Sequence, residues 1–131
     1  MQQRREEVFV HLVWSTWDRK PLIDNELRPW LWATIATIAR ETGCPWVVVG
    51  GVEDHVHLLC ALPATLAVAE LANRVKGGSS RAANARNPES LRWQGGYAVF
   101  SVSPRDRDML EAYVRNQELH HSGRLELAEW E

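Results

Sequence analysis

The alternation of apolar and polar side chains along the chain predicts four β-strands. Residues 8–14 (VFVHLVW) are β-branched or aromatic at most positions, which is typical of a strand. Two more apolar runs, 45–52 and 55–62, are joined by the turn that the GGVED sequence contains, and together they predict a hairpin. A fourth run of the same character covers residues 96–103.

Apolar residues at helical spacing predict two helices between these strands. The first occupies residues 26–43, with apolar positions at Leu27, Leu31, Ile35 and Ile38. Either it begins at Pro29, or Asp24 caps a kinked first turn. The second helix follows Pro63, with its apolar series at Leu66, Ala69, Leu71 and Val75. It runs into the Gly-Gly-Ser-Ser sequence of residues 74–90, which we expect to be a loop or a frayed helix end.

The residues that follow the fourth strand predict a further helix over 103–123. Ser103 stands in the cap position, Pro104 in the first helical position and Asp106 at the acid position of a capping box, and Gly123 marks the end. The resulting order is β-α-β-β-α-β plus a C-terminal helix. We therefore expect an α+β protein with a ferredoxin-like antiparallel sheet, whose two crossover helices leave one sheet face open for a partner or ligand.

The composition fits one domain over residues 1–131, because 45% apolar residues suffice for a single core. No segment has the apolar length of a signal peptide or a membrane span, so we expect a cytoplasmic protein without a membrane partner. Cys44 and Cys60 lack the spacing of a metal motif, and we expect both to be buried. We assign the seven tryptophans to core and dimer packing rather than to base stacking.

The basic residues of this mildly acidic chain are concentrated in one region. The formal net charge is -2, which argues against an indiscriminate polyanion binder. Between residues 71 and 105, however, six basic residues stand against the single acid Glu89. A solvated helix face explains such a cluster as well as a nucleic-acid site does. The second interpretation makes DNA contacts of four residues: Arg74, Lys76, Arg81 and Arg86.

Two histidines interrupt the apolar strand at 55–62. Because side chains alternate along a strand, His55 and His57 lie on one face, and the other face is wholly apolar, with Val56, Leu58, Cys60 and Leu62. Such a pair can present two nitrogen ligands to one metal ion if a third group comes from elsewhere in the fold. His11 falls in the first predicted strand, and we interpret it as a hydrogen-bonded histidine rather than as a third ligand.

The last predicted helix carries polar groups along one side. Tyr113, Gln117 and then His120 or His121 are spaced by one or two helical turns. A lone helical tyrosine is most often a packed aromatic residue. Here, however, the same side offers a third metal ligand and a nucleophile, the two parts that the histidine strand lacks. Tyr97 has no polar partner at useful spacing, so we assign it a packing role.

These motifs together resemble a known family. The sequences DHVHLL, VKGGSSR, SVS and YVRNQELHH, in this order, resemble the single-tyrosine HUH transposases of small bacterial insertion sequences, including the REP-associated tyrosine transposases. The sequence HLVWSTWDRKPL is similar to the family's first strand, so the resemblance spans about residues 8–121. A histidine-hydrophobic-histidine triplet is common by chance, but its combination with the downstream tyrosine and Asn-Gln pair is specific.

The resemblance implies a role for each matching residue. It makes His55 and His57 metal ligands, Tyr113 the nucleophile and Gln117 the third ligand. Three further residues match the family's NQxxHH pattern without a defined role: Asn116, His120 and His121. The implied cofactor is Mg²⁺ or Mn²⁺.

The resemblance also implies a reaction and an assembly. The implied substrate is single-stranded DNA that carries a hairpin, cleaved and rejoined through a 5'-phosphotyrosine intermediate. The implied assembly is a homodimer in which each tyrosine helix serves the partner's histidines. The alternative is a domesticated module of the same fold that binds structured nucleic acid without cutting it. A zinc-stabilised regulatory domain is a weaker third possibility.

Overall fold

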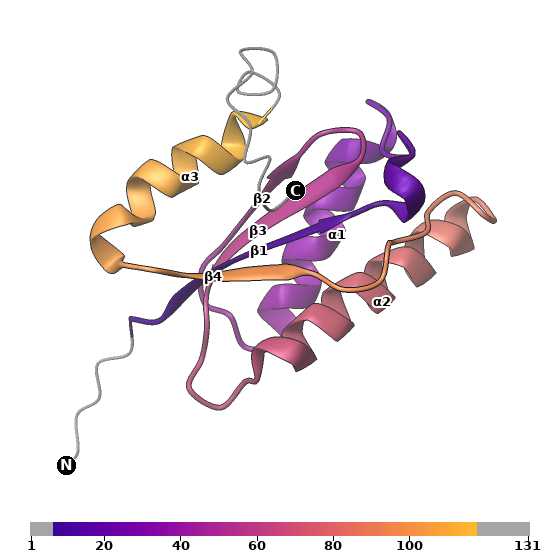
Figure 1. Ribbon diagram of the computed structural model, residues 1–131. Helices are drawn as coiled ribbons and strands as arrows, with labels where there is room; N and C mark the ends of the chain where they lie inside the picture. The colour runs from indigo at the N-terminus through magenta and orange to yellow at the C-terminus, as the bar shows by residue number, and fades with distance from the viewer. Residues whose placement is uncertain (1–6, 118–131) are drawn as a thin grey trace.

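The predicted strands form one antiparallel sheet in a computed structural model of the chain, which describes residues 7–117. The strands lie in the order β2-β3-β1-β4, where β1 is Phe9–Ser15, β2 Val47–Gly51, β3 His55–Ala61 and β4 Ala98–Val102. β3 lies between β1 and β2, which is the split βαβ arrangement. The structure thus confirms the predicted α+β class and ferredoxin-like topology (Figure 1).

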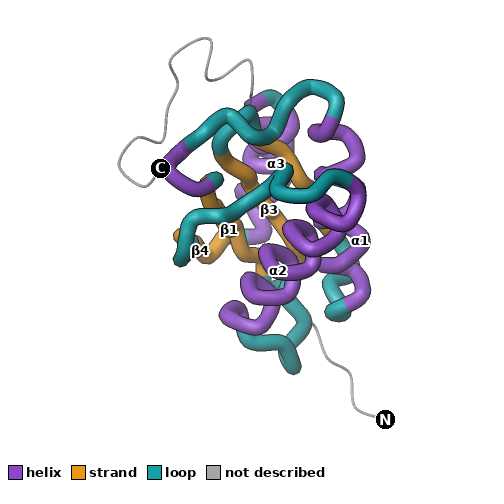
Figure 2. The backbone as a smooth tube through the Cα atoms, turned by 90° about the vertical axis from the view of Figure 1, so that its right-hand side faces the viewer, coloured by secondary structure: helices purple, strands orange, loops and turns teal. Residues whose placement is uncertain are grey.

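The helices occupy both faces of this sheet. α1 (Leu27–Glu41) and α2 (Val68–Arg86) pack side by side on one face, as Figures 1 and 2 show. α3 (Arg107–Arg115) packs against β2 and β3 on the other face, which the split βαβ pattern leaves open. Two short 3-10 helices, Trp17–Arg19 and Pro104–Asp106, precede longer elements. Within the described part of the chain, no helix is long and apolar enough to cross a membrane.

The alternation of the strands divides the core in two. One cluster joins α1 and α2 to one face of the sheet and includes Val10, Leu12, Trp14, Val56, Leu58 and both buried cysteines, Cys44 and Cys60. The second cluster lies under α3 and consists of Phe9, Val48, Leu59, Val102 and Val114. α3 approaches the sheet closely at Gly50, where a side chain would overlap the Val114 carbonyl.

The Gly-Gly-Ser-Ser sequence is helical, so the expectation of a loop or frayed end there was wrong. α2 continues through it to Arg86 because small residues allow α1 and α2 to approach each other. A Cβ atom at Gly78 would lie 2.8 Å from Ile38 Cδ1 of α1. Ser79 is buried, and its hydroxyl donates a hydrogen bond to the Lys76 carbonyl at 3.1 Å. Tertiary packing here outweighs the low helix propensity of glycine and serine.

The helix ends agree in part with the sequence signals. α1 begins at Leu27, whose backbone N–H donates to Asp24 Oδ1 at 2.7 Å, so Asp24 caps the first turn and Pro29 lies within it. The Ser103 hydroxyl accepts a hydrogen bond from the Arg105 backbone N–H. The predicted stop at Gly123 lies outside the described residues.

Candidate active site

Adjacent strands bring three histidines together on the α3 side of the sheet. In the antiparallel register, Val13 of β1 pairs with His57 of β3, so His11 and His57 are diagonal neighbours. A hydrogen bond of 2.8 Å joins His11 Nε2 to His57 Nδ1, and the two rings are stacked with centroids 5.0 Å apart. The rings of His55 and His57 are roughly perpendicular, with centroids 5.1 Å apart. All three side chains are buried.

Asp54 fixes the ring of His55. Its Oδ1 lies 2.8 Å from His55 Nδ1, and its Oδ2 lies 3.3 Å from Arg19 Nε. Burial alone would raise the pKa of Asp54, but the hydrogen bond with His55 and the nearby Arg19 guanidinium together lower this pKa below its usual value. The carboxylate therefore stays ionised near neutral pH and orients the imidazole. Sequence reasoning did not assign a role to Asp54 or Arg19.

α3 places Tyr113 directly against the histidines. The Tyr113 ring stands edge-on to the His57 ring, with centroids 5.9 Å apart and planes at 88°. One turn later, Gln117 is 1% exposed, and its Nε2 donates to the Tyr113 carbonyl at 3.2 Å. Gln117 Oε1 is buried and accepts no hydrogen bond from the described residues. Asn116 is exposed and donates to the Ala112 carbonyl, so it closes the helix end instead of joining this group.

The donor atoms of this group fit a divalent cation. Both histidine Nδ1 atoms are engaged, by Asp54 and by His11, so coordination would use Nε2 of His55 and of His57. Residues 7–117 contain no cluster of three or more His, Cys, Asp or Glu side chains that could hold a metal ion. The buried Gln117 Oε1 is the donor that would complete a three-ligand set with the two imidazoles. Amide oxygen suits both Mg²⁺ and Mn²⁺, whereas imidazole nitrogen favours transition metals, so the mixed set fits Mn²⁺ better than Mg²⁺. His120 and His121 lie outside the described residues.

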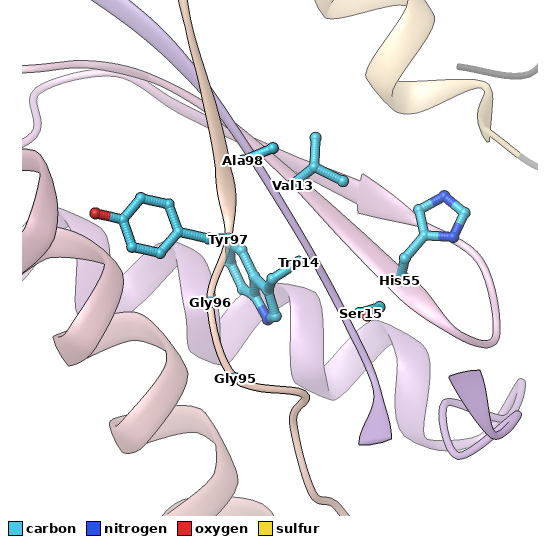
Figure 3. Close-up of a pocket in the computed structure, with 8 residues that line it drawn as sticks. All are labelled: Val13, Trp14, Ser15, His55, Gly95, Gly96, Tyr97 and Ala98. Carbon is cyan, nitrogen blue, oxygen red and sulfur yellow. The ribbon is translucent and has the colours of Figure 1, made fainter. Parts of the chain in front are cut away.

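A cavity of about 260 Å³ opens beside His55, where β1 and the chain before β4 separate. Its lining is shown in Figure 3 and consists of Val13, Trp14, Ser15, His55, Gly95, Gly96, Tyr97 and Ala98. The Tyr97 ring points away from His55 in this view. Tyr97 and His55 thus line the same cavity, but the tyrosine ring is not directed at the histidines.

The four basic residues proposed to contact DNA lie apart from the histidines. Arg74, Lys76, Arg81 and Arg86 all belong to α2, on the opposite face of the sheet. The Lys76 ammonium donates hydrogen bonds to the carbonyls of Gln94 and Gly96, at 2.9 and 2.6 Å, and burial lowers its pKa. The Arg86 guanidinium lies over the Trp30 ring, 4.3 Å from its centroid. Two of the four thus make contacts within the chain.

Comparison with known proteins places the chain in a family. Residues 5–117 match the family model of IS200-like transposases. The ISDra2 transposase TnpA of Deinococcus radiodurans is 25% identical over 118 residues, which cover 85% of this chain and 84% of that protein. A crystal structure of a candidate transposase from Deinococcus radiodurans R1 matches with a TM-score of 0.71 and 25% identity, over 89% of this chain and 98% of that one.

A more distant structure shares the fold. A REP-associated tyrosine transposase bound to a REP hairpin matches with a TM-score of 0.60 and 15% identity, over 92% of this chain and 74% of that one. The family match covers the four strands, the three helices and the residues that surround the histidines. The chain belongs to the IS200-like transposases.

Proposed function

We propose that this protein is a metal-dependent transposase that cleaves and rejoins hairpin-bearing single-stranded DNA through a covalent tyrosine intermediate. Membership of the family supports DNA strand transfer. One observation supports the tyrosine nucleophile and the metal: the edge-on contact of Tyr113 with His57, next to the buried Gln117 amide. The REP hairpin bound by the REP-associated tyrosine transposase of the same fold supports a hairpin substrate.

Tyr113 is the nucleophile in this proposal. Its phenolic oxygen attacks the scissile phosphorus, so that a phosphorus–tyrosine bond forms while the bond to the 3'-oxygen breaks. The phenol gives up its proton as it attacks and the departing 3'-oxygen takes one up, so the products are a 5'-phosphotyrosine and a free 3'-hydroxyl. The energy of the phosphodiester is kept in the covalent intermediate. A 3'-hydroxyl from another strand can therefore reverse the step without a nucleotide triphosphate.

His55, His57 and Gln117 would hold the divalent cation. When bound, Mg²⁺ or Mn²⁺ supplies polarisation of the scissile phosphodiester and stabilises charge on the departing oxygen. Asp54 and His11 hold the two imidazoles through their Nδ1 atoms, which leaves Nε2 of each ring as the atom that would bind a metal ion. The two partners also keep the histidines oriented before the metal and the DNA arrive.

The test of this proposal uses the full chain and hairpin-bearing single-stranded DNA labelled at either end. With Mn²⁺ present, the 3'-labelled DNA should form an adduct with the protein that survives a denaturing gel. The 5'-labelled DNA should shorten to a fragment that a polymerase can extend from its free 3'-hydroxyl. A chelator should prevent both. Binding without any adduct would favour the non-cleaving nucleic-acid-binding module instead.

The position of α3 supports a site built from one chain. Tyr113 lies against His57 of its own chain, whereas the family resemblance implies a tyrosine helix that serves the partner. We propose a homodimer because joining two DNA ends requires two nucleophiles, with each of its two sites assembled in cis.

We therefore expect no complementation between two inactive chains. A purified heterodimer of a His57→Ala chain and a Tyr113→Phe chain should form no more adduct than either homodimer, because each of its sites lacks one part. The matched control pairs a wild-type chain with a chain that carries both substitutions. In cis this control keeps one intact site and about half of the wild-type adduct, whereas in trans it keeps none. Activity in the first heterodimer and its absence in the second would refute the cis arrangement.

A further inference from the structure

One tryptophan in the described residues does not contribute to the core. Trp14 is buried in the core, and four others pack against the two clusters: Trp30, Trp32, Trp46 and Trp93. Trp17 belongs to neither cluster and is 38% exposed. Because an indole is among the largest apolar groups that a protein can bury, its exposure gives up stability that the five other tryptophans gain.

Arg92 covers one side of this tryptophan. The Arg92 guanidinium carbon lies 3.8 Å from the Trp17 ring centroid, and the Trp17 backbone N–H donates to the Arg92 carbonyl at 2.9 Å. Arg92 is itself exposed. The pair, which we call the Trp17–Arg92 platform, offers solvent an aromatic ring and a planar cation, the two kinds of surface on which nucleobases stack.

The backbone around the platform is held in a defined shape. Thr16 and Trp93 form a β-bridge, and the Gln94 backbone N–H donates to the Ser15 carbonyl at 2.9 Å. The next residues, Asp18 and Arg19, have φ angles of 56° and 53°. Non-glycine residues in this left-handed region cost energy, and such strain is concentrated at functional sites. An exposed indole held by a strained backbone is therefore unlike a residue left at the surface by chance.

The platform is connected to the candidate active site by short contacts. Ser15, two residues before Trp17, pairs with His55. Arg19, two residues after Trp17, contacts Asp54, which in turn is hydrogen-bonded to His55. The same segment carries exposed Lys20 and one exposed acid, Asp18, so the basic residues outnumber the acid. A DNA strand whose scissile phosphate lies at the histidines would thus pass a basic, aromatic surface at the same end of the sheet.

We propose that the Trp17–Arg92 platform binds one unpaired nucleobase of the single-stranded DNA by stacking; this inference rests on the proposed function. Stacking uses the face of the base, so it anchors the strand with little dependence on sequence. The guanidinium adds attraction for the neighbouring phosphates. The sequence alone indicates core and dimer packing for all seven tryptophans. This proposal gives Trp17 a role in DNA binding instead.

The test combines substitution of the platform with removal of single bases. Binding is measured for full-length Tyr113→Phe protein, which cannot cleave, on hairpin DNA with an abasic nucleotide at each unpaired position in turn. Adding Trp17→Ala should weaken binding of intact DNA by about 5-fold to 150-fold. One abasic position should weaken the parent by a similar factor and have no further effect on Trp17→Ala. Trp17→Phe keeps an aromatic face and should retain most of the affinity and the sensitivity to that position.

A neighbouring charge provides the matched control. Lys20→Gln should lower affinity equally at every abasic position and reduce the salt dependence of binding, because it removes only a phosphate attraction. Unchanged affinity in Trp17→Ala, or a loss that no abasic position cancels, overturns the platform. If the wild-type chain still forms its metal-dependent adduct in that case, the proposed function stands. If the parent binds no DNA at all, the proposed function fails and the platform with it.

Discussion

We expect replacement of Tyr113 with phenylalanine to abolish the covalent adduct between protein and DNA and to leave DNA affinity within about twofold of the wild type. The substitution removes only the phenolic oxygen, so the ring can keep its edge-on contact with His57 and its packing near Val114. Denaturing gels of 3'-labelled hairpin DNA measure the adduct, and filter binding or fluorescence anisotropy measures affinity.

Tyr97→Phe is the matched control for this experiment. Tyr97 also lines the cavity beside His55, but its ring points away from the histidine. We expect this variant to form the adduct at the wild-type rate. An adduct that persists in Tyr113→Phe and disappears in Tyr97→Phe would transfer the role of nucleophile to Tyr97.

We expect replacement of His57 with alanine to eliminate metal-stimulated cleavage. One imidazole and one amide hold a divalent ion poorly, so added Mn²⁺ or Mg²⁺ should no longer change the cleavage rate. Isothermal titration with Mn²⁺ should show the loss of binding directly. His57 is fully buried and hydrogen-bonded to His11, so a thermal melt must establish that the variant is folded. Cleavage by wild-type protein that continues in a chelator would refute the metal mechanism.

Asp54→Asn gives a graded version of the same experiment. Both imidazoles remain in this variant, but the group that orients His55 loses its charge. We expect Mn²⁺ affinity to fall by about 10-fold to 100-fold, with cleavage restored at high Mn²⁺ concentration. Restoration separates this effect from misfolding, because added metal cannot rescue a chain that does not fold.

The strands and the histidine face were predictable because their pattern is local. Alternation along residues 55–62 assigns His55 and His57 to one face of the strand, and this assignment does not depend on tertiary contacts. The helical continuation of α2 was not predictable in this way. Glycine and serine disfavour a helix locally, and the contact of Gly78 with Ile38 that reverses this preference joins residues 40 positions apart in the sequence.

The groups that contact the histidines also differ in whether the contact is local in the sequence. Asp54 precedes His55 in the sequence, so its contact was accessible to local reasoning. The bond between His11 and His57 depends on the register of β1 against β3. The contact of Arg19 with Asp54 depends on a left-handed backbone at Asp18 and Arg19, for which no glycine gives a signal.

Charge counting located the basic residues without showing how their charges are used. Lys76 lies in the basic region, but its ammonium is bonded to the carbonyls of Gln94 and Gly96. Arg92 lies in the same region and stacks on Trp17. Sequence alone does not distinguish a cation that positions a loop from one that faces solvent, because both have the same formal charge.

The close approach of α3 to the sheet at Gly50 has a consequence for how DNA is selected. The Val114 backbone rests on a residue without a side chain, so main-chain contact fixes the height of Tyr113 above β3. Because this contact is between backbones, rotation of neighbouring side chains cannot move the α3 backbone closer to the sheet or further from it. We therefore expect the backbone that carries Tyr113 to keep its position. The single-stranded DNA must then bend to bring its scissile phosphate to the tyrosine. Flexibility of the strand around the cleavage position then becomes a criterion for cleavage, separate from the identity of its bases.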